Sequence, residues 1–127
     1  MVPPYRAQLD TALALLGDGR LGEARARLSR LSRNHPGEPE IGLHLAGALH
    51  AAGRHTEALP VFLTVLDRFP DLSVAAVGLS RVWRELGETE NAKKILLRYI
   101  TKSPENPTLL AELAGLWHFE HEFETAI

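Results

Sequence analysis

A single interval of 34 residues runs along nearly the whole of this 127-residue chain. Glycine, alanine and proline each recur at that interval, as Gly19, Gly53 and Gly87, as Ala24, Ala58, Ala92 and Ala126, and as Pro36, Pro70 and Pro104. A fixed period of this length is typical of a solenoid, in which each unit buries its apolar face by stacking on its neighbours. The period therefore predicts a stack of repeated units rather than one compact core.

Apolar residues recur with helical spacing inside each interval, and glycine or proline marks the places where helices end. We predict helices over residues 4–17, 21–34, 39–52, 56–69, 73–86, 89–102 and 107–120, and the start of an eighth in residues 121–127. Thr56 and Asn106 are predicted N-caps, because their side-chain oxygens can accept hydrogen bonds from the first turn. Gly19, Gly53 and Gly87 follow helix ends, so we expect each to adopt a positive φ, which alanine resists.

Side-chain size also follows the repeat. Small residues stand where the two helices of a pair are expected to cross closely, at Ala12, Ala24, Ala46, Ala58, Ser80, Ala92, Ala114 and Ala126. Larger side chains there would force the helices apart at a cost of about 1–3 kcal/mol each. Leu28, Phe62 and Leu96 are expected to fill the space between one helix pair and the next.

With glycine closing the first helix of each unit, alanine early in the second and proline after it, the chain resembles the tetratricopeptide repeat family. The second unit shows the pattern most fully, in Leu45, Ala46, Leu49, Gly53, Ala58, Phe62 and Pro70. The chain departs from the family where a tryptophan is common, at Gln8, Gly42, Ala76 and Leu110, and where a tyrosine is usual, at Trp83 and Trp117. The resemblance implies an all-α, right-handed superhelical solenoid of antiparallel helix pairs, with the first helices lining a concave groove.

We therefore predict one repeat domain over residues 1–127, with units at 3–36, 37–70 and 71–104 and an incomplete unit at 105–127. Because the sequence stops soon after its eighth expected helix begins, we expect it to be a fragment of a longer protein. The unfinished unit also supports an alternative in which a second copy covers the exposed end. The residues predicted for such self-association are Leu113, Trp117, Phe119 and Phe123.

Charge and hydropathy exclude several kinds of partner. The 14 lysines and arginines against 16 acidic residues give a net charge of -2, which provides no attraction to nucleic acid or to an acidic membrane. Four arginines of the second helix (Arg25, Arg27, Arg30 and Arg33) lack interleaved aromatic residues, which favours a solvated face over a nucleic-acid site. No apolar run approaches the roughly 18 residues that span a bilayer, and no signal peptide is visible, so a soluble, cytoplasmic protein is expected.

The residues that usually carry catalysis or hold metals are sparse. The chain has no cysteine, no Gly-rich phosphate loop and no serine-histidine constellation. His118 and His121 lie three residues apart, but two histidines near a helix end are more often solvated than bound to a metal. We therefore predict no enzymatic activity, no cofactor and no metal.

The family resemblance turns one side of the first helices toward the groove. Residues predicted to line this groove are Leu9, Leu13, Leu43, Gly47, His50, Val77, Arg81, Arg84, Ala111, Gly115 and His118. Such a surface suits an extended peptide or an amphipathic helix, with Leu43, Gly47 and Val77 as apolar anchors and Arg81 and Arg84 binding acidic groups. The alternative is that Leu9, Leu13 and Leu43 pack beneath a neighbouring segment.

Chaperone-binding members of the family clamp a terminal carboxylate with lysine and asparagine on the groove helices. The matching positions here hold Leu9, Leu13, Leu43 and Gly47, so the resemblance implies that the acidic tails of heat-shock chaperones are not ligands. We expect a protein-protein interaction scaffold that binds a protein or peptide. The alternatives are a non-catalytic repeat appendage of a larger enzyme, used for docking or assembly, and a self-association module.

Overall fold

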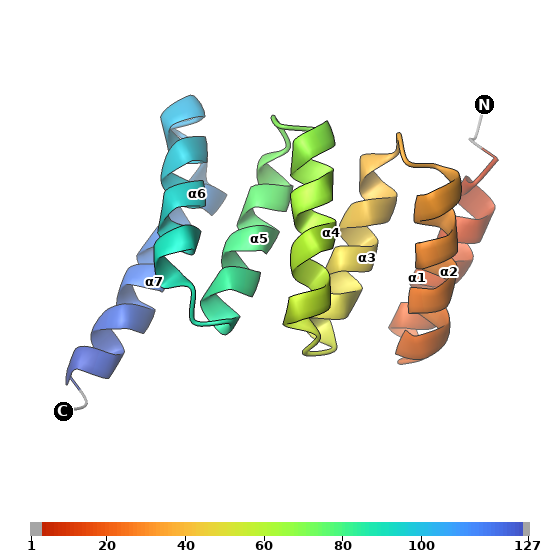
Figure 1. The fold of residues 1–127 in the computed structure, drawn as a ribbon, viewed down its shortest axis with the longest axis horizontal. Helices are drawn as coiled ribbons and strands as arrows, with labels where there is room; N and C mark the ends of the chain where they lie inside the picture. Colours follow the sequence, from red (N-terminus) through yellow and green to blue (C-terminus); the bar gives the residue numbers. More distant parts are fainter. Residues whose placement is uncertain (1–3, 126–127) are drawn as a thin grey trace.

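The computed structural model describes residues 4–125, and the side chains of residues 4–118. The described chain forms helices separated by short turns (Figure 1). The helices are α1 (Arg6–Gly17), α2 (Leu21–Asn34), α3 (Pro39–Ala51), α4 (His55–Arg68), α5 (Ser73–Glu85), α6 (Thr89–Lys102) and α7 (Pro107–Thr125). The predicted all-α class is confirmed.

Successive helices pair and stack along one direction. Each of α1, α3 and α5 packs on the helix that follows it, and each pair packs on the next, so that one elongated hydrophobic core runs from α1 to α7. Figure 1 shows α2, α4 and α6 in a near layer and α1, α3, α5 and α7 in a layer behind it. We call α1, α3, α5 and α7 the first helices and α2, α4 and α6 the second helices. This two-layered stack is the predicted solenoid.

Glycines set the turns inside the helix pairs. Gly19, Gly53 and Gly87 have φ of 78°, 77° and 80°, and they are the only residues with positive φ in the described part of the chain. In each case the residue after the glycine donates its backbone N–H back into the preceding helix, as Arg54 does to Leu49 over 2.9 Å. The left-handed conformation therefore turns the chain sharply enough for the next helix to pack back, as predicted.

The core confirms the predicted division between small and large side chains. Ala12, Ala24, Ala46, Ala58, Ala92 and Ser80 are all buried, and so are the larger Leu28, Phe62 and Leu96. Phe62 packs against Gly78 of α5, where an added Cβ would lie 2.4 Å from its ring. Ala114 differs from its counterparts, because it is exposed on α7. Ala126 lies outside the described residues.

Two predictions about helix ends can be compared with the structure. Asn106 caps α7, since its Oδ1 accepts the backbone N–H groups of Thr108 at 3.0 Å and Leu109 at 3.3 Å. The N-cap predicted at Thr56 is wrong, because α4 already begins at His55 and its N-cap, Arg54, forms no side-chain capping bond. The turn through Gly53 brings the chain back into helical geometry one residue earlier than expected.

The predicted break near residue 120 is also wrong, because α7 continues through to Thr125. The position that holds glycine in the three preceding units is His121 here. Histidine enters the left-handed conformation far less readily than glycine, so the chain continues as a helix instead of turning. The eighth helix predicted from residue 121 is therefore the last part of α7. No helix within the described chain is long and apolar enough to cross a membrane.

Candidate functional site

The predicted groove residues fall on three rows, each of which crosses the first helices at the repeat interval of 34 residues. The inner row consists of Leu9, Leu43, Val77 and Ala111. The middle row consists of Leu13, Gly47, Arg81 and Gly115. The outer row consists of Leu16, His50, Arg84 and His118, of which Leu16 was not predicted.

Two inner-row residues belong to the core rather than to the groove surface. Leu9 is completely buried and Val77 is 6% exposed, so the prediction that they contact a partner is corrected. Leu43 is half-buried against the core, and only Ala111 of this row is exposed. The physical reason is that packing of the helices removes these apolar side chains from water. Leu9 is thus covered by the helices described here, and no further segment is needed to bury it.

The middle row is the accessible line. Gly47, Arg81 and Gly115 are exposed, and Leu13 is half-buried against the core. A Cβ added at Gly47 or Gly115 would meet no atom within 4 Å, so the surface above both glycines is open. A peptide backbone could therefore approach α3 and α7 closely at these positions.

Residues on the other side of the middle row share the same face and were missed from the sequence. They are Arg6, Asp10, Glu40, His44, Val74 and Glu112. The signal that could have found them is helical spacing, because positions three and seven residues before the middle row lie on the same side of a helix. Val74 is 57% exposed and is the most exposed large apolar side chain in the described chain. The accessible face is thus centred closer to the starts of the first helices than predicted.

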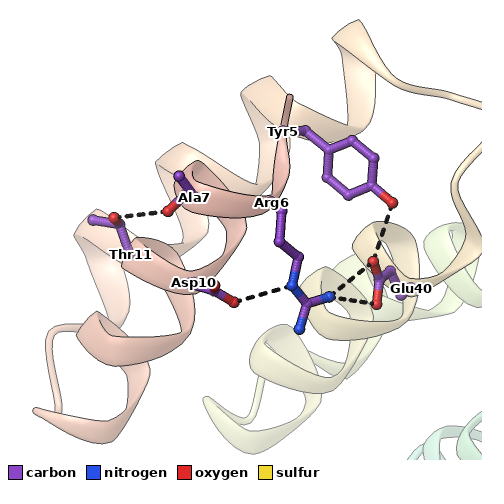
Figure 2. A network of polar contacts seen from close by, with 6 residues as sticks. All are labelled: Tyr5, Arg6, Ala7, Asp10, Thr11 and Glu40. Carbon is purple, nitrogen blue, oxygen red and sulfur yellow. Dashed lines mark hydrogen bonds and ion pairs between the residues drawn. The ribbon is translucent and has the colours of Figure 1, made fainter. Parts of the chain in front are cut away.

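Charged residues at the N-terminal end of this face pair with one another (Figure 2). Arg6 bridges Asp10 at 3.4 Å and Glu40 of α3 at 3.2 Å. The Tyr5 hydroxyl lies 3.0 Å from Glu38 and 3.2 Å from Glu40 and can donate to either carboxylate. Burial and these two hydrogen bonds raise the pKa of Tyr5 to about 12, so the hydroxyl keeps its proton at neutral pH. The network ties the first unit to the second.

A second ion pair lies at the other end of the face, between α5 and α7. The guanidinium of Arg81 contacts Glu112 of α7, with Nε 2.9 Å from Oε1. The hydrogen bond to Glu112 raises the pKa of Arg81 above its usual value. Because Glu112 occupies this guanidinium, an acidic group of a partner would have to compete with it. Arg84, which was predicted to share that role, is half-buried on the same helix.

A histidine pair lies between these two ends. Nδ1 of His50, near the end of α3, is 3.0 Å from Nδ1 of His55, at the start of α4. Burial lowers the pKa of His50, and His55, Arg81 and Arg84 lower it further, while Glu85 acts in the opposite direction. One of the two rings must be able to accept the shared hydrogen, so at least one is neutral. His55 is a residue of this region that the sequence did not single out.

The end predicted for self-association is partly described. Trp117 is 52% exposed and lies edge-on to His118 with ring centroids 5.3 Å apart, while Leu113 is half-buried. The side chains of Phe119 and Phe123 lie outside the described residues. Within the described part of the chain no group of three histidine or acidic residues is placed to hold a metal ion. His121 also lies outside the described side chains.

Comparison with solved structures identifies the same architecture. The first TPR domain of Spaghetti (RPAP3), solved with an HSP90 peptide, matches with a TM-score of 0.80 at 16% identity, covering 91% of each chain. The Sgt2 TPR domain from Aspergillus fumigatus matches with a TM-score of 0.84 at 16% identity, covering 98% of this chain and 83% of that one. MamA from Desulfovibrio magneticus matches with a TM-score of 0.80 at 20% identity, covering 98% and 70%. At these identities the similarity shows the fold.

Sequence comparison supports the same assignment independently. No curated protein matches this chain significantly. Two models of the tetratricopeptide repeat match it, one over residues 9–73 and the other over residues 49–116. Together they cover residues 9–116, and thus the 34-residue repeats from the first helix pair into α7. The chain belongs to the tetratricopeptide repeat family.

Proposed function

We propose that this chain is a protein-interaction scaffold whose first helices bind a segment of a partner protein. The observation that carries the proposal is the middle row, where exposed Gly47 and Gly115 leave the backbone of α3 and α7 open to close approach. Half-buried Leu13 and Leu43 and exposed Val74 supply apolar surface beside it. An extended peptide could bury these side chains while its backbone lies close to the glycines.

The ion pairs on this face favour a ligand that is recognised by its apolar surface over one that is recognised by its charge. Arg6 and Arg81 already pair with Glu40 and Glu112, so binding a partner carboxylate would cost an existing ion pair. The likeness to a domain that binds an HSP90 peptide lies in the fold, at 16% identity. We infer that the ligand is a mainly apolar or uncharged segment rather than an acidic chaperone tail.

The test uses a phage-displayed library of random sixteen-residue peptides, selected on the wild-type chain. Enriched peptides are synthesised with a fluorophore, and their affinities are measured by fluorescence anisotropy. Gly47→Tyr places a ring over the middle row without a clash at Cβ, and we expect it to weaken binding by about tenfold or more.

Gly22→Tyr is the matched control, because Gly22 is also a helical, exposed glycine with open space at Cβ but lies on α2. It should leave the affinity unchanged. If Gly47→Tyr and wild type bound every selected peptide equally, the assignment of the groove to the first helices would be wrong.

Self-association is a second candidate function, favoured by the exposed Leu110 and Trp117 on α7. Two copies that covered this surface would form a dimer whose population depends on concentration. Sedimentation equilibrium over a wide concentration range tests it directly. A dimer that Trp117→Glu abolishes supports this function, and a monomer at every concentration rejects it.

A further inference from the structure

The opposite face of the stack carries two hollows that the proposed function does not use. The first lies among α2, α3 and α4 and has a volume of about 270 Å³. The second lies among α4, α5 and α6 and has a volume of about 440 Å³. Its exposed lining residues include Leu63 and Asp67 of α4 and Lys94 and Arg98 of α6, so the second hollow opens on the side of the second helices.

The two hollows are built from equivalent positions of successive repeats. Leu45 and Leu79 lie on the first helix of each, Val61 and Ile95 on the second, and Pro36 and Pro70 in the preceding turn. Each of these pairs is 34 residues apart. The hollows therefore follow from the stacking of the repeats. They lie in line along the side of the stack formed by the second helices, which we call the outer face.

What differs between the hollows is charge. The first is lined mainly by apolar groups, and its arginine, Arg68, donates to the carbonyl of Pro36 at 2.7 Å. At three equivalent positions Pro60, Thr64 and Arg68 are replaced in the second hollow by Lys94, Arg98 and Lys102. Hence one hollow offers apolar contacts and the next adds a cationic wall.

The cationic side chains of the second hollow form one row on α6. Lys94, Arg98 and Lys102 follow each other at four-residue spacing, so they lie along one side of α6 over about 12 Å. Lys102 lies 4.0 Å from Asp71. Within the described chain, Lys94 and Arg98 form no ion pair, and Asp67 is the one acidic residue lining this hollow. The local charge is therefore positive although the whole chain carries -2.

We propose that the outer face of α4, α5 and α6 binds an acidic peptide segment that also carries apolar side chains. Carboxylates would pair with Lys94 and Arg98, and an apolar side chain would bury the 44% exposed Leu63 at the edge of the hollow. A single-stranded nucleic acid fits less well, because it needs aromatic faces on which bases can stack. Two aromatic residues line this hollow: Tyr99 is 5% exposed and donates its hydroxyl to the carbonyl of Pro70, so only the half-buried Trp83 offers a face to a base, and there is no row of such faces.

The experiment is performed on the Gly47→Tyr variant, in which the face of the first helices is obstructed, so the outcome does not depend on the proposed function. A phage-displayed library of random sixteen-residue peptides is selected on this variant, and the enriched peptides are measured by fluorescence anisotropy. We expect them to be rich in Asp and Glu with apolar residues between. Lys94→Glu combined with Arg98→Glu should raise their Kd at least about tenfold.

Arg27→Glu combined with Arg30→Glu is the matched control, because it changes the net charge equally through two exposed arginines of α2. The milder pair Lys94→Gln and Arg98→Gln guards against misfolding and should still weaken binding several-fold. Selection of no peptide that depends on Lys94 and Arg98, or equal loss in the α2 control, would overturn the proposal. Tighter binding of a twenty-nucleotide oligothymidine through the same two residues would also overturn it, in favour of nucleic acid.

Discussion

Gly78 provides the sharpest test of the packing between repeats. This glycine lies inside α5, and a Cβ there would be 2.4 Å from Cε1 and 2.5 Å from Cζ of Phe62. Phe62 is 4% exposed and is enclosed by the core, so its ring cannot move aside freely. The Gly78→Ala change should therefore force two repeat units apart.

The expected magnitude combines two opposing terms. Alanine is favoured over glycine inside a helix by about 1 kcal/mol, whereas overpacking a core costs about 1–3 kcal/mol. Gly78→Ala should thus lower the free energy of unfolding by between zero and about 2 kcal/mol. Gly47→Ala, with no atom within 4 Å of the added Cβ, keeps only the helical gain and should stabilise the chain by about 1 kcal/mol.

Urea unfolding followed by far-ultraviolet circular dichroism measures the free energy of unfolding of both variants. The same measurement is made on Phe62→Leu alone and combined with Gly78→Ala. Leucine lacks the two ring atoms that the new methyl group would meet, so Gly78→Ala should be tolerated there about as well as Gly47→Ala. The coupling energy between positions 62 and 78 should fall in the range of about 0.5–3 kcal/mol. If Gly78→Ala were as stable as Gly47→Ala in the wild-type background, the described contact between the repeats would be wrong.

Three further changes test the turns, the cap and the histidine pair. Gly87→Ala, at φ of 80°, should lower the free energy of unfolding by about 1–2 kcal/mol in thermal or urea unfolding, and an unchanged value would contradict the left-handed turn. Asn106→Ala removes the acceptor at the start of α7 and should cost about 1 kcal/mol, with Asn106→Asp retaining most of the stability. Because the pKa of His50 is lowered in the fold, the unfolded chain takes up its proton first as the pH falls. Its stabilising contribution is therefore complete above about pH 6.5 and is lost below it, so His50→Gln should flatten the decrease in melting temperature on acidification. If the melting temperatures of His50→Gln and the wild type decreased equally on acidification, this role of the pair with His55 would be rejected.

The sequence predicted the repeated part of the fold well because each marker residue has one dominant physical role. A glycine after a helix is needed where the chain must adopt positive φ, and Gly19, Gly53 and Gly87 all do so. Small residues such as Ala46 and Ala58 are needed where helices approach closely, and both are buried. These requirements are local, so they can be recognised without knowing which residues meet in space.

The prediction of helix ends failed where the 34-residue period was extended to a unit that lacks the turn glycine. A new helix was expected in residues 121–127 because Ala126 occupies the alanine position of the repeat, which places the turn of the fourth unit at residue 121. The turn depends on glycine, and with His121 at that position the helix runs on to Thr125. The identity of one residue therefore outweighs a period that the rest of the chain obeys.

The groove was harder to predict than the fold, since spacing along a helix gives a face only to within about one residue. The predicted set included Leu9 and Val77, which are buried in the core. It omitted Glu40 and Glu112, whose pairing with Arg6 and Arg81 removes charge from the surface. Which charges remain unpaired depends on contacts between repeats, more than 30 residues apart in sequence, that no single helix encodes.

The two faces of the stack therefore differ in what salt should do to them. On the first helices the described ion pairs Arg6–Glu40 and Arg81–Glu112 neutralise the cations internally, so a ligand there gains affinity mainly from apolar contact. On the outer face Lys94 and Arg98 keep their charge for a partner, and attraction between exposed charges weakens as the Debye length shortens from about 10 Å at 0.1 M salt to about 3 Å at 1 M. Raising the salt concentration should thus release an acidic peptide from the outer face and leave a peptide on the first helices bound. Equal salt dependence at the two faces would mean that the internal ion pairs open on binding, and the distinction drawn from them would fail.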